Sequence, residues 1–168
     1  MSDRTRLARD SPVDKVQHQL AIEPLLARVD DDILIVMRLA AARPETRLIG
    51  VVDGSGALVG VLPILRLVEA VVARVAPESL LTDIADMGDV RRFGSAVEAR
   101  VVGDVMLPPA AIAGTATVDA AFHVMRTRHL SALYVIDDAG RPSGYLDLLE
   151  LAVSYVDALE DVPPPDPS

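Results

Sequence analysis

Few residues of this chain have the types and spacing that catalysis or metal binding requires. The acids at 30–32 could together bind a divalent cation, but they precede an apolar segment, where acids cap helices and complement the helix dipole. His18, His123 and His129 lack the spacing of metal ligands. The sequence contains no nucleophile elbow and no paired carboxylates that stand out. We therefore predict helix capping for the acids at 30–32 and expect a protein that is not an enzyme.

Two groups of charged residues could bind a small ligand. Arg126, Arg128 and His129 end a predicted helix, so their positive charge suits either a bound anion or the negative end of the helix dipole. Glu150 could accept hydrogen bonds from a ligand or could be a solvated helix acid. The residues alone leave both alternatives open in each case.

The composition limits the classes of partner. The 168 residues carry a net charge of −9, which disfavours nucleic acid, and they include no cysteine, which excludes disulfides and thiolate metal sites. The most apolar segment, 57–75, is interrupted by Pro63, Arg66 and Glu69, so we expect no membrane span. The charged N-terminus does not resemble a signal peptide. We expect a soluble, cytoplasmic protein.

The chain contains an internal repeat. VVDGSGALVGVLPIL at 51–65 matches VIDDAGRPSGYLDLL at 135–149 with an offset of 84. Upstream, Val36-Met37-Arg38 matches Val124-Met125-Arg126 with an offset of 88, which implies four extra residues in the first copy. Two matches in the same order predict a duplication.

Each copy has the pattern strand, helix, strand, turn, strand, helix. The fold class expected is α/β (α+β), with two β-α-β-β-α repeats packed sheet to sheet in pseudo-two-fold symmetry. We expect Val118, Ala121, Phe122 and Met125 to share the buried face of one helix. The last helix should bury Leu148, Leu149, Ala152, Tyr155 and Val156, and the two second helices should begin at Pro63 and Asp147.

These elements predict the domain boundaries. We expect a disordered tail at 1–12, a first repeat at 13–75, a linker at 76–102, a second repeat at 103–159 and a disordered tail at 160–168. The linker reads as short helices that break at Gly88 and Gly94.

The arrangement resembles a tandem pair of cystathionine-β-synthase (CBS) domains, also called a Bateman module. The second copy carries the clearer resemblance, through GDVM at 103–106, TVDAA at 117–121, MRTRHLS at 125–131, VIDDAG at 135–140 and GYLDLLE at 144–150. The resemblance covers roughly residues 13–159 and includes stand-alone CBS-domain proteins.

The resemblance implies a regulatory, usually dimeric module whose members often bind adenosine-containing ligands in clefts between the repeats. The family's binding signature places a Ser or Thr hydroxyl at a helix start and, three residues later, an Asp that accepts hydrogen bonds from ribose. Here Pro63 and Arg66 replace them in the first copy, and Asp147 and Glu150 replace them in the second. Arg66 is a hydrogen-bond donor where ribose needs an acceptor. The two clefts should therefore be unequal.

Carried onto this chain, the resemblance favours a site beside Glu150 for an adenosine nucleotide, nucleoside or adenosyl compound. Ile112, Ala132 and Leu133 would enclose the adenine, while Asp147 would disfavour phosphate unless Arg128 or a cation offsets its charge.

Two alternatives to this ligand sensor remain open. One is a non-liganded dimerising scaffold, and the other is a sensor of divalent cations such as magnesium. In every case we expect a homodimer that acts on an unknown partner protein.

Overall fold

The computed structural model describes residues 9–78 and 85–160, which form two compact units. The central unit comprises Glu23–Pro109. The terminal unit joins the described residues up to Ile22 with those from Ala110 onward. The units therefore differ from the two predicted repeats, because residues 13–22 of the first repeat and residues 103–109 of the second each belong to the other unit.

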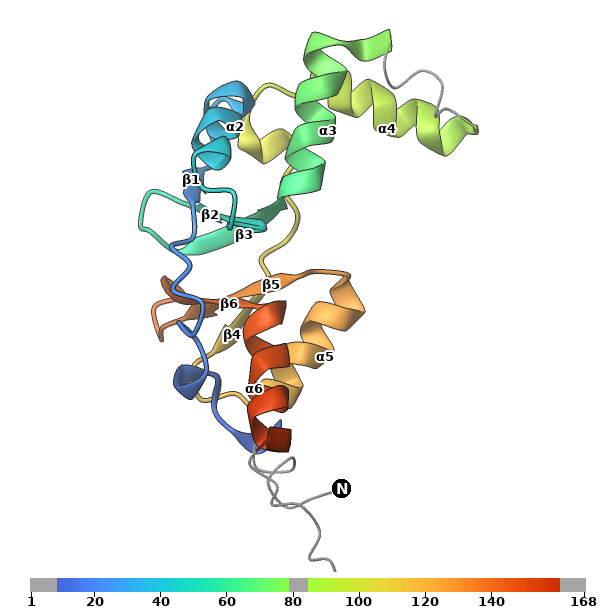
Figure 1. Cartoon of the computed structure of the whole chain (residues 1–168). Coiled ribbons are helices and arrows are strands. Elements are labelled where there is room, and N and C mark those ends of the chain that lie inside the picture. The colour runs from blue at the N-terminus through green and yellow to red at the C-terminus, as the bar shows by residue number, and fades with distance from the viewer. Residues whose placement is uncertain (1–8, 79–84, 161–168) are drawn as a thin grey trace, which may run out of the picture. The chain divides into compact units, whose positions relative to one another are not determined.

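The central unit has a three-stranded sheet in the order β1-β2-β3, in which the first pair is parallel and the second antiparallel. Helices α2 and α3 cover the same face of this sheet (Figure 1). Its core includes Ile33, Ile49, Leu62 and Leu67. The elements are β1 (Leu26–Arg28), α2 (Ile33–Ala41), β2 (Leu48–Val52), β3 (Leu58–Pro63), α3 (Ile64–Val75), α4 (Met87–Glu98) and the 3₁₀ helix η3 (Val102–Asp104).

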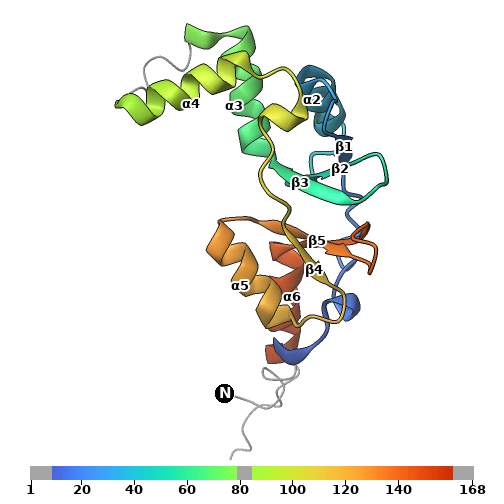
Figure 2. The same cartoon turned by 180° about the vertical axis from the view of Figure 1, so that it is seen from behind.

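The terminal unit repeats this topology with a sheet in the order β4-β5-β6. Helices α5 and α6 lie together on one face of that sheet, as Figure 2 shows from behind. The unit begins with a 3₁₀ helix from the N-terminal segment. The elements are η1 (Val13–Lys15), β4 (Ala111–Ala113), α5 (Val118–Arg128), β5 (Ala132–Ile136), β6 (Pro142–Asp147) and α6 (Leu148–Glu160).

The duplication is confirmed, but its register in the first helices differs from the prediction. Strands β2 and β3 do match β5 and β6 with an offset of 84. Helices α2 and α5 begin after their caps Asp32 and Thr117, and the buried residues Ile33, Val36 and Ala40 correspond to Val118, Ala121 and Met125, all with an offset of 85. The Val-Met-Arg match at offset 88 is therefore wrong, because it would place buried Met125 opposite half-buried Met37.

The predicted faces of two helices are also partly wrong. On α5, Val118, Ala121 and Met125 are buried, but Phe122 is 41% exposed. On α6, the apolar Leu149, Ala152 and Val156 face solvent. Among the α6 residues whose side chains are described, Glu150, Leu151 and Ser154 are buried. Since α6 is apolar on several sides, the apolar pattern alone could not identify the side that faces the core.

The linker contains one continuous helix, so the breaks predicted at Gly88 and Gly94 are wrong. Helix α4 runs through both glycines from a capping box, in which Asp86 accepts from the Asp89 N–H and Asp89 accepts from the Asp86 N–H. This start stabilises α4 against the cost of about 1 kcal/mol that an interior glycine imposes. Residues 79–84 of the linker lie outside the described residues.

The predicted tails lie mostly outside the described residues, which begin at Arg9 and end at residue 160. Residues 9–12, assigned to the tail by sequence, are instead joined to the terminal unit. The Arg9 Nε atom donates to the Asp119 carboxylate at 3.0 Å, and Pro12 pairs with Thr117.

The prediction that the second helices begin at Pro63 and Asp147 is wrong by one residue. Each ends a strand, and α3 and α6 begin one residue later.

Replacing Met125 tests the core assignment. Met125 is 1% exposed, so Met125→Ala should lower the free energy of unfolding by about 2–5 kcal/mol through lost burial and a cavity. Phe122→Ala, on the exposed side of the same helix, should cost less than about 1 kcal/mol. Denaturant unfolding of both variants measures the difference. Equal costs would contradict the assignment of the α5 face.

Candidate functional site

The predicted ligand residues Asp147 and Glu150 form the start of α6. The Asp147 carboxylate Oδ1 accepts a hydrogen bond from the Leu149 N–H at 2.8 Å, which is the role of an N-cap. Glu150 Oε2 accepts from the Asp147 N–H at 3.0 Å. The two carboxylates thus satisfy backbone donors at the positive end of the α6 dipole.

The second oxygen of Glu150 contacts the N-terminal segment. Glu150 Oε1 accepts a hydrogen bond from the Leu20 N–H at 3.0 Å. We call residues 13–21 the strap, because they cross the terminal unit next to this carboxylate. Glu150 is only 1% exposed, and both of its oxygens already accept backbone N–H groups. A ligand hydroxyl that binds Glu150 must therefore replace one of these donors.

The strap is attached to the loop that precedes α5. The Val13 N–H donates to the Ala116 carbonyl at 2.9 Å, and the Asp14 N–H donates to the Gly114 carbonyl at 3.1 Å. Further along, His18 and Ala21 adopt φ angles of 75° and 48°. Non-glycine residues in this left-handed region cost free energy, which the surrounding contacts must offset.

A close approach also fixes the strap against β6. A Cβ atom at Gly144 would lie 1.9 Å from Gln17 Oε1, so only glycine fits here with Gln17 in its present position. Gln17 Oε1 is buried and has no hydrogen-bond partner among the described residues.

The remaining predicted residues of this site belong to the same unit. Ala132 on β5 is the cross-strand partner of Asp147, and its neighbour Leu133 is buried. Ile112 lies on β4 and pairs with Val135 of β5. Arg128 is half-buried at the end of α5. The structure thus brings Ala132 next to Asp147.

Arg66, the seventh predicted residue, lies in the central unit at the position equivalent to Glu150. Its Nε atom donates to the Val105 carbonyl, directly after η3. Arg66 therefore binds the backbone of the segment that precedes β4, as Glu150 binds the backbone of the segment that precedes β1. The two equivalent side chains have opposite hydrogen-bond polarity.

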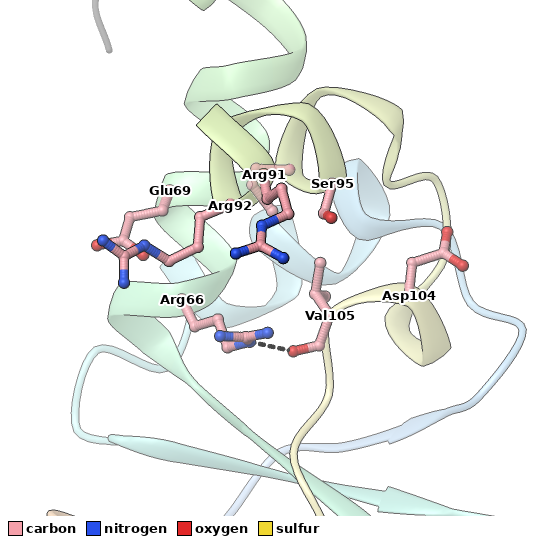
Figure 3. Close-up of a pocket in the computed structure, with 9 residues that line it drawn as sticks. Arg66, Glu69, Arg91, Arg92, Ser95, Asp104 and Val105 are labelled. Atoms are coloured by element: carbon pink, nitrogen blue, oxygen red, sulfur yellow. Dashed lines mark hydrogen bonds between the residues drawn. The ribbon is translucent and has the colours of Figure 1, made fainter. Parts of the chain in front are cut away.

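Arg66 also lines a pocket within the central unit (Figure 3). The pocket has a volume of about 280 Å³ and lies between α3, α4 and the residues around η3. Its other cationic residues, Arg91 and Arg92, were not predicted, because α4 has no counterpart in the second repeat. The lining residues are Arg66, Glu69, Ala70, Arg91, Arg92, Ser95, Ala96, Asp104 and Val105.

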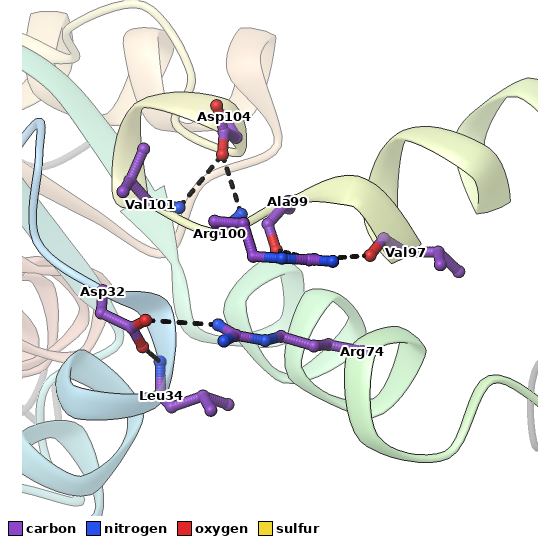
Figure 4. Close-up of polar contacts among 8 residues, drawn as sticks. All are labelled: Asp32, Leu34, Arg74, Val97, Ala99, Arg100, Val101 and Asp104. Carbon is purple, nitrogen blue, oxygen red and sulfur yellow. Dashed lines mark hydrogen bonds and ion pairs between the residues drawn. The ribbon is translucent and has the colours of Figure 1, made fainter.

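Two acids of the central unit accept hydrogen bonds from backbone N–H groups (Figure 4). Asp32 is the N-cap of α2, as predicted, and the Leu34 N–H and Arg74 lower its pKa. The Asp104 carboxylate accepts from the N–H groups of Arg100 and Val101, which lower its pKa. Among the described residues, no group of three or more acidic or histidine side chains could hold a metal ion.

Comparisons with known proteins identify the fold. Residues 102–156 match the family model of the CBS domain. This segment of the chain is a CBS domain. A search of curated proteins found no match.

Solved structures of CBS-domain proteins resemble most of the chain. A CBS domain-containing protein from Thermotoga maritima superposes with a TM-score of 0.68 at 18% identity, covering 86% of this chain and 94% of that one. CBSX2 in complex with AMP has a TM-score of 0.63 at 17% identity and covers 87% and 97%; the CBSX2 CBS-pair protein is from Arabidopsis thaliana. The CBS-domain pair of MJ0100, in complex with 5′-methylthioadenosine and S-adenosyl-L-methionine, has a TM-score of 0.59 at 15% identity and covers 85% and 98%. At these identities the likeness shows the fold: mixed α+β, with two three-stranded sheets.

The helices in the described part of the chain include none that is long and apolar enough to cross a membrane.

Substitution of Glu150 tests its role in holding the strap. Glu150→Gln replaces one acceptor oxygen by a donor, so either the Leu20 or the Asp147 N–H loses its partner, at a cost of about 1–3 kcal/mol. Hydrogen exchange at the Leu20 amide should become about tenfold faster or more. Glu45→Gln, at an exposed loop position, is the control. Unchanged exchange at both amides would contradict the assignment.

Proposed function

We propose that this CBS-domain pair is a regulatory module that senses an adenosine-type ligand through Glu150. One observation carries the proposal. The Glu150 carboxylate lies at the start of α6, at the position of the family's ribose-binding acid, in a fold whose solved relatives include complexes with AMP and with S-adenosyl-L-methionine. The module itself carries out no reaction in this proposal and acts on an unknown partner protein.

The hydrogen bonds of Glu150 suggest how binding becomes a signal. Ribose hydroxyls would compete with the Leu20 N–H for Glu150 Oε1. Strap residues His18 and Ala21 are in the costly left-handed region, so release of the strap offsets part of the lost hydrogen bonding. Ligand binding is thereby linked to the position of the strap. A ligand that binds more tightly when the strap is released than when it is attached to Glu150 shifts the equilibrium toward the released state.

The remaining residues of the proposed site set its preference. Ile112, Ala132 and Leu133 supply apolar surface for an adenine. Asp147 disfavours a phosphate near the α6 start, unless Arg128 or a cation offsets its charge. A nucleoside or a cationic adenosyl compound is therefore favoured over a nucleotide. At Arg66 and Pro63 of the central unit, no side-chain acceptor is available for ribose.

We further propose that the module is a cytoplasmic homodimer. Helix α6 buries polar Glu150 and Ser154 and exposes an apolar stripe, in which Leu149 is 48% and Val156 50% exposed. Phe122 of the neighbouring α5 is also exposed, and on α3 the equivalent residue Leu65 is 69% exposed. Exposed apolar surface of this extent is typical of an interface, and a second copy would cover it.

Calorimetry with adenosine, S-adenosyl-L-methionine, AMP, ATP and magnesium chloride tests the ligand. Glu150→Ala should abolish binding of an adenosine compound, because the ribose loses a charged acceptor. Asp147→Thr should strengthen AMP or ATP binding, because a like charge is removed. Glu45→Ala is the control.

Four outcomes would contradict parts of this proposal. Unchanged affinity in Glu150→Ala would place the ligand elsewhere. Weaker nucleotide binding in Asp147→Thr would indicate that Asp147 acts through a bound cation. A response to magnesium alone would favour a cation sensor, and no response to any compound would favour a scaffold without ligand.

Sedimentation of the full chain at micromolar concentration should show a dimer. A double substitution, Leu149→Glu with Val156→Glu, should give monomers, because charges in an apolar interface lose hydration. Ala139→Glu, at an exposed turn position, should leave the dimer intact. A monomeric wild-type chain would defeat the proposal.

A further inference from the structure

The pocket between α3 and α4 gathers three arginines in a protein of net charge −9. Arg66 extends from α3, while Arg91 and Arg92 extend from α4. In Figure 3 the guanidinium groups of Arg66 and Arg91 point into the same space. Guanidinium groups that share a pocket repel each other, so an anion between them would be stabilised by both.

The arginines around this space differ in how many of their donors have a partner. Arg92 pairs with Asp89 on its own helix. Arg66 uses only its Nε atom, which donates to the Val105 carbonyl, and its two terminal nitrogens have no hydrogen-bond partner within the described part of the chain. Arg91 has neither a hydrogen bond nor an ion pair with any described residue. Among the described residues, the terminal nitrogens of Arg66 and the guanidinium of Arg91 therefore have donors to spare.

The neighbouring arginines of the central unit show the contrast (Figure 4). Arg74 pairs with Asp32 at 3.3 Å. Arg100 donates to the carbonyls of Val97 and Ala99 at 2.8 and 2.9 Å. These two side chains have partners within the central unit, in contrast to Arg91.

The two acids that line the pocket offset part of this positive charge. Asp104 already accepts hydrogen bonds from the Arg100 and Val101 N–H groups. Glu69 lies beside Arg92 in Figure 3, on the opposite side of the pocket from Asp104. Ser95 adds a hydroxyl donor to the lining.

We propose that this pocket binds a phosphate group, held by Arg66 and Arg91 with the Ser95 hydroxyl as a third donor. Planar guanidinium groups match the geometry of phosphate oxygens and bind them in pairs. The hydrogen bond to Val105 fixes the Arg66 side chain before binding, which reduces the entropy lost on binding. The volume of about 280 Å³ suits inorganic phosphate or the phosphate end of a small phosphorylated compound. This site is independent of the adenosine proposal, because it uses no residue of the terminal unit.

Titrations of the full chain with inorganic phosphate, AMP and adenosine, followed by NMR of the arginine side chains in low-chloride buffer, test the site. Phosphate should bind saturably and shift the Arg66 and Arg91 resonances. Arg91→Gln should weaken phosphate binding about tenfold or more, as expected for a lost charged hydrogen bond. Arg66→Gln should have a similar effect. Arg38→Gln, an exposed arginine of α2 outside the pocket, should have none.

The three compounds separate the sources of the phosphate. If AMP binds more tightly than inorganic phosphate and Arg91→Gln weakens AMP but not adenosine, the pocket holds the phosphate of a nucleotide. If inorganic phosphate binds and AMP does not shift Arg91, the ligand is free phosphate. The proposal is overturned if phosphate shifts neither arginine, or if Arg38→Gln weakens binding as much as Arg91→Gln. Adenosine binding that depends on Glu150 alone leaves these outcomes unaffected, so the two sites are tested separately.

Discussion

Hydrogen bonding at the start of α6 is the interaction on which the terminal unit depends. A buried carboxylate is tolerated only where its oxygens accept hydrogen bonds, and Glu150 meets this condition with one N–H from the end of β6 and one from the strap. Asp147 completes the arrangement by capping α6. The strap, the last residue of β6 and the first turn of α6 are therefore stabilised together, although the strap is more than a hundred residues away in sequence.

The central unit makes the equivalent contact with the hydrogen-bond donor and acceptor exchanged. Helix α3 begins after Pro63, which has no side-chain cap, and Arg66 instead donates to the carbonyl of Val105. In both units the third residue of the second helix binds the backbone that enters from the preceding segment. The duplication has thus kept the contact between these segments, while the hydrogen-bond donor in one unit became the acceptor in the other.

The sequence was sufficient for features that depend on local pattern. The strands follow from short apolar segments bounded by turns, and the Asp32 cap follows from acids before an apolar run. The buried side of α6 could not be predicted, because Leu149 and Val156 suit an interior as well as Leu151 does. The partner of Glu150 was hidden for another reason: Leu20 contributes a backbone N–H, which every non-proline residue carries. Arg91 escaped prediction because its approach to Arg66 depends on how α4 packs against α3.

Hydrogen-bond polarity also constrains which ligand groups each unit can receive. An ionised carboxylate such as Glu150 has only lone pairs to offer, so it favours hydroxyl or amine donors and repels phosphate oxygens. A guanidinium group offers only donors and positive charge, so Arg66 favours phosphate over ribose. If Glu150 and Arg66 were exchanged, their ligand preferences would be exchanged only where the neighbouring charges also favour the new residue. In the central unit the neighbouring Arg91 has the same charge as Arg66. In the terminal unit Asp147 reinforces Glu150, so the preference at each position belongs to a pair of side chains rather than to one.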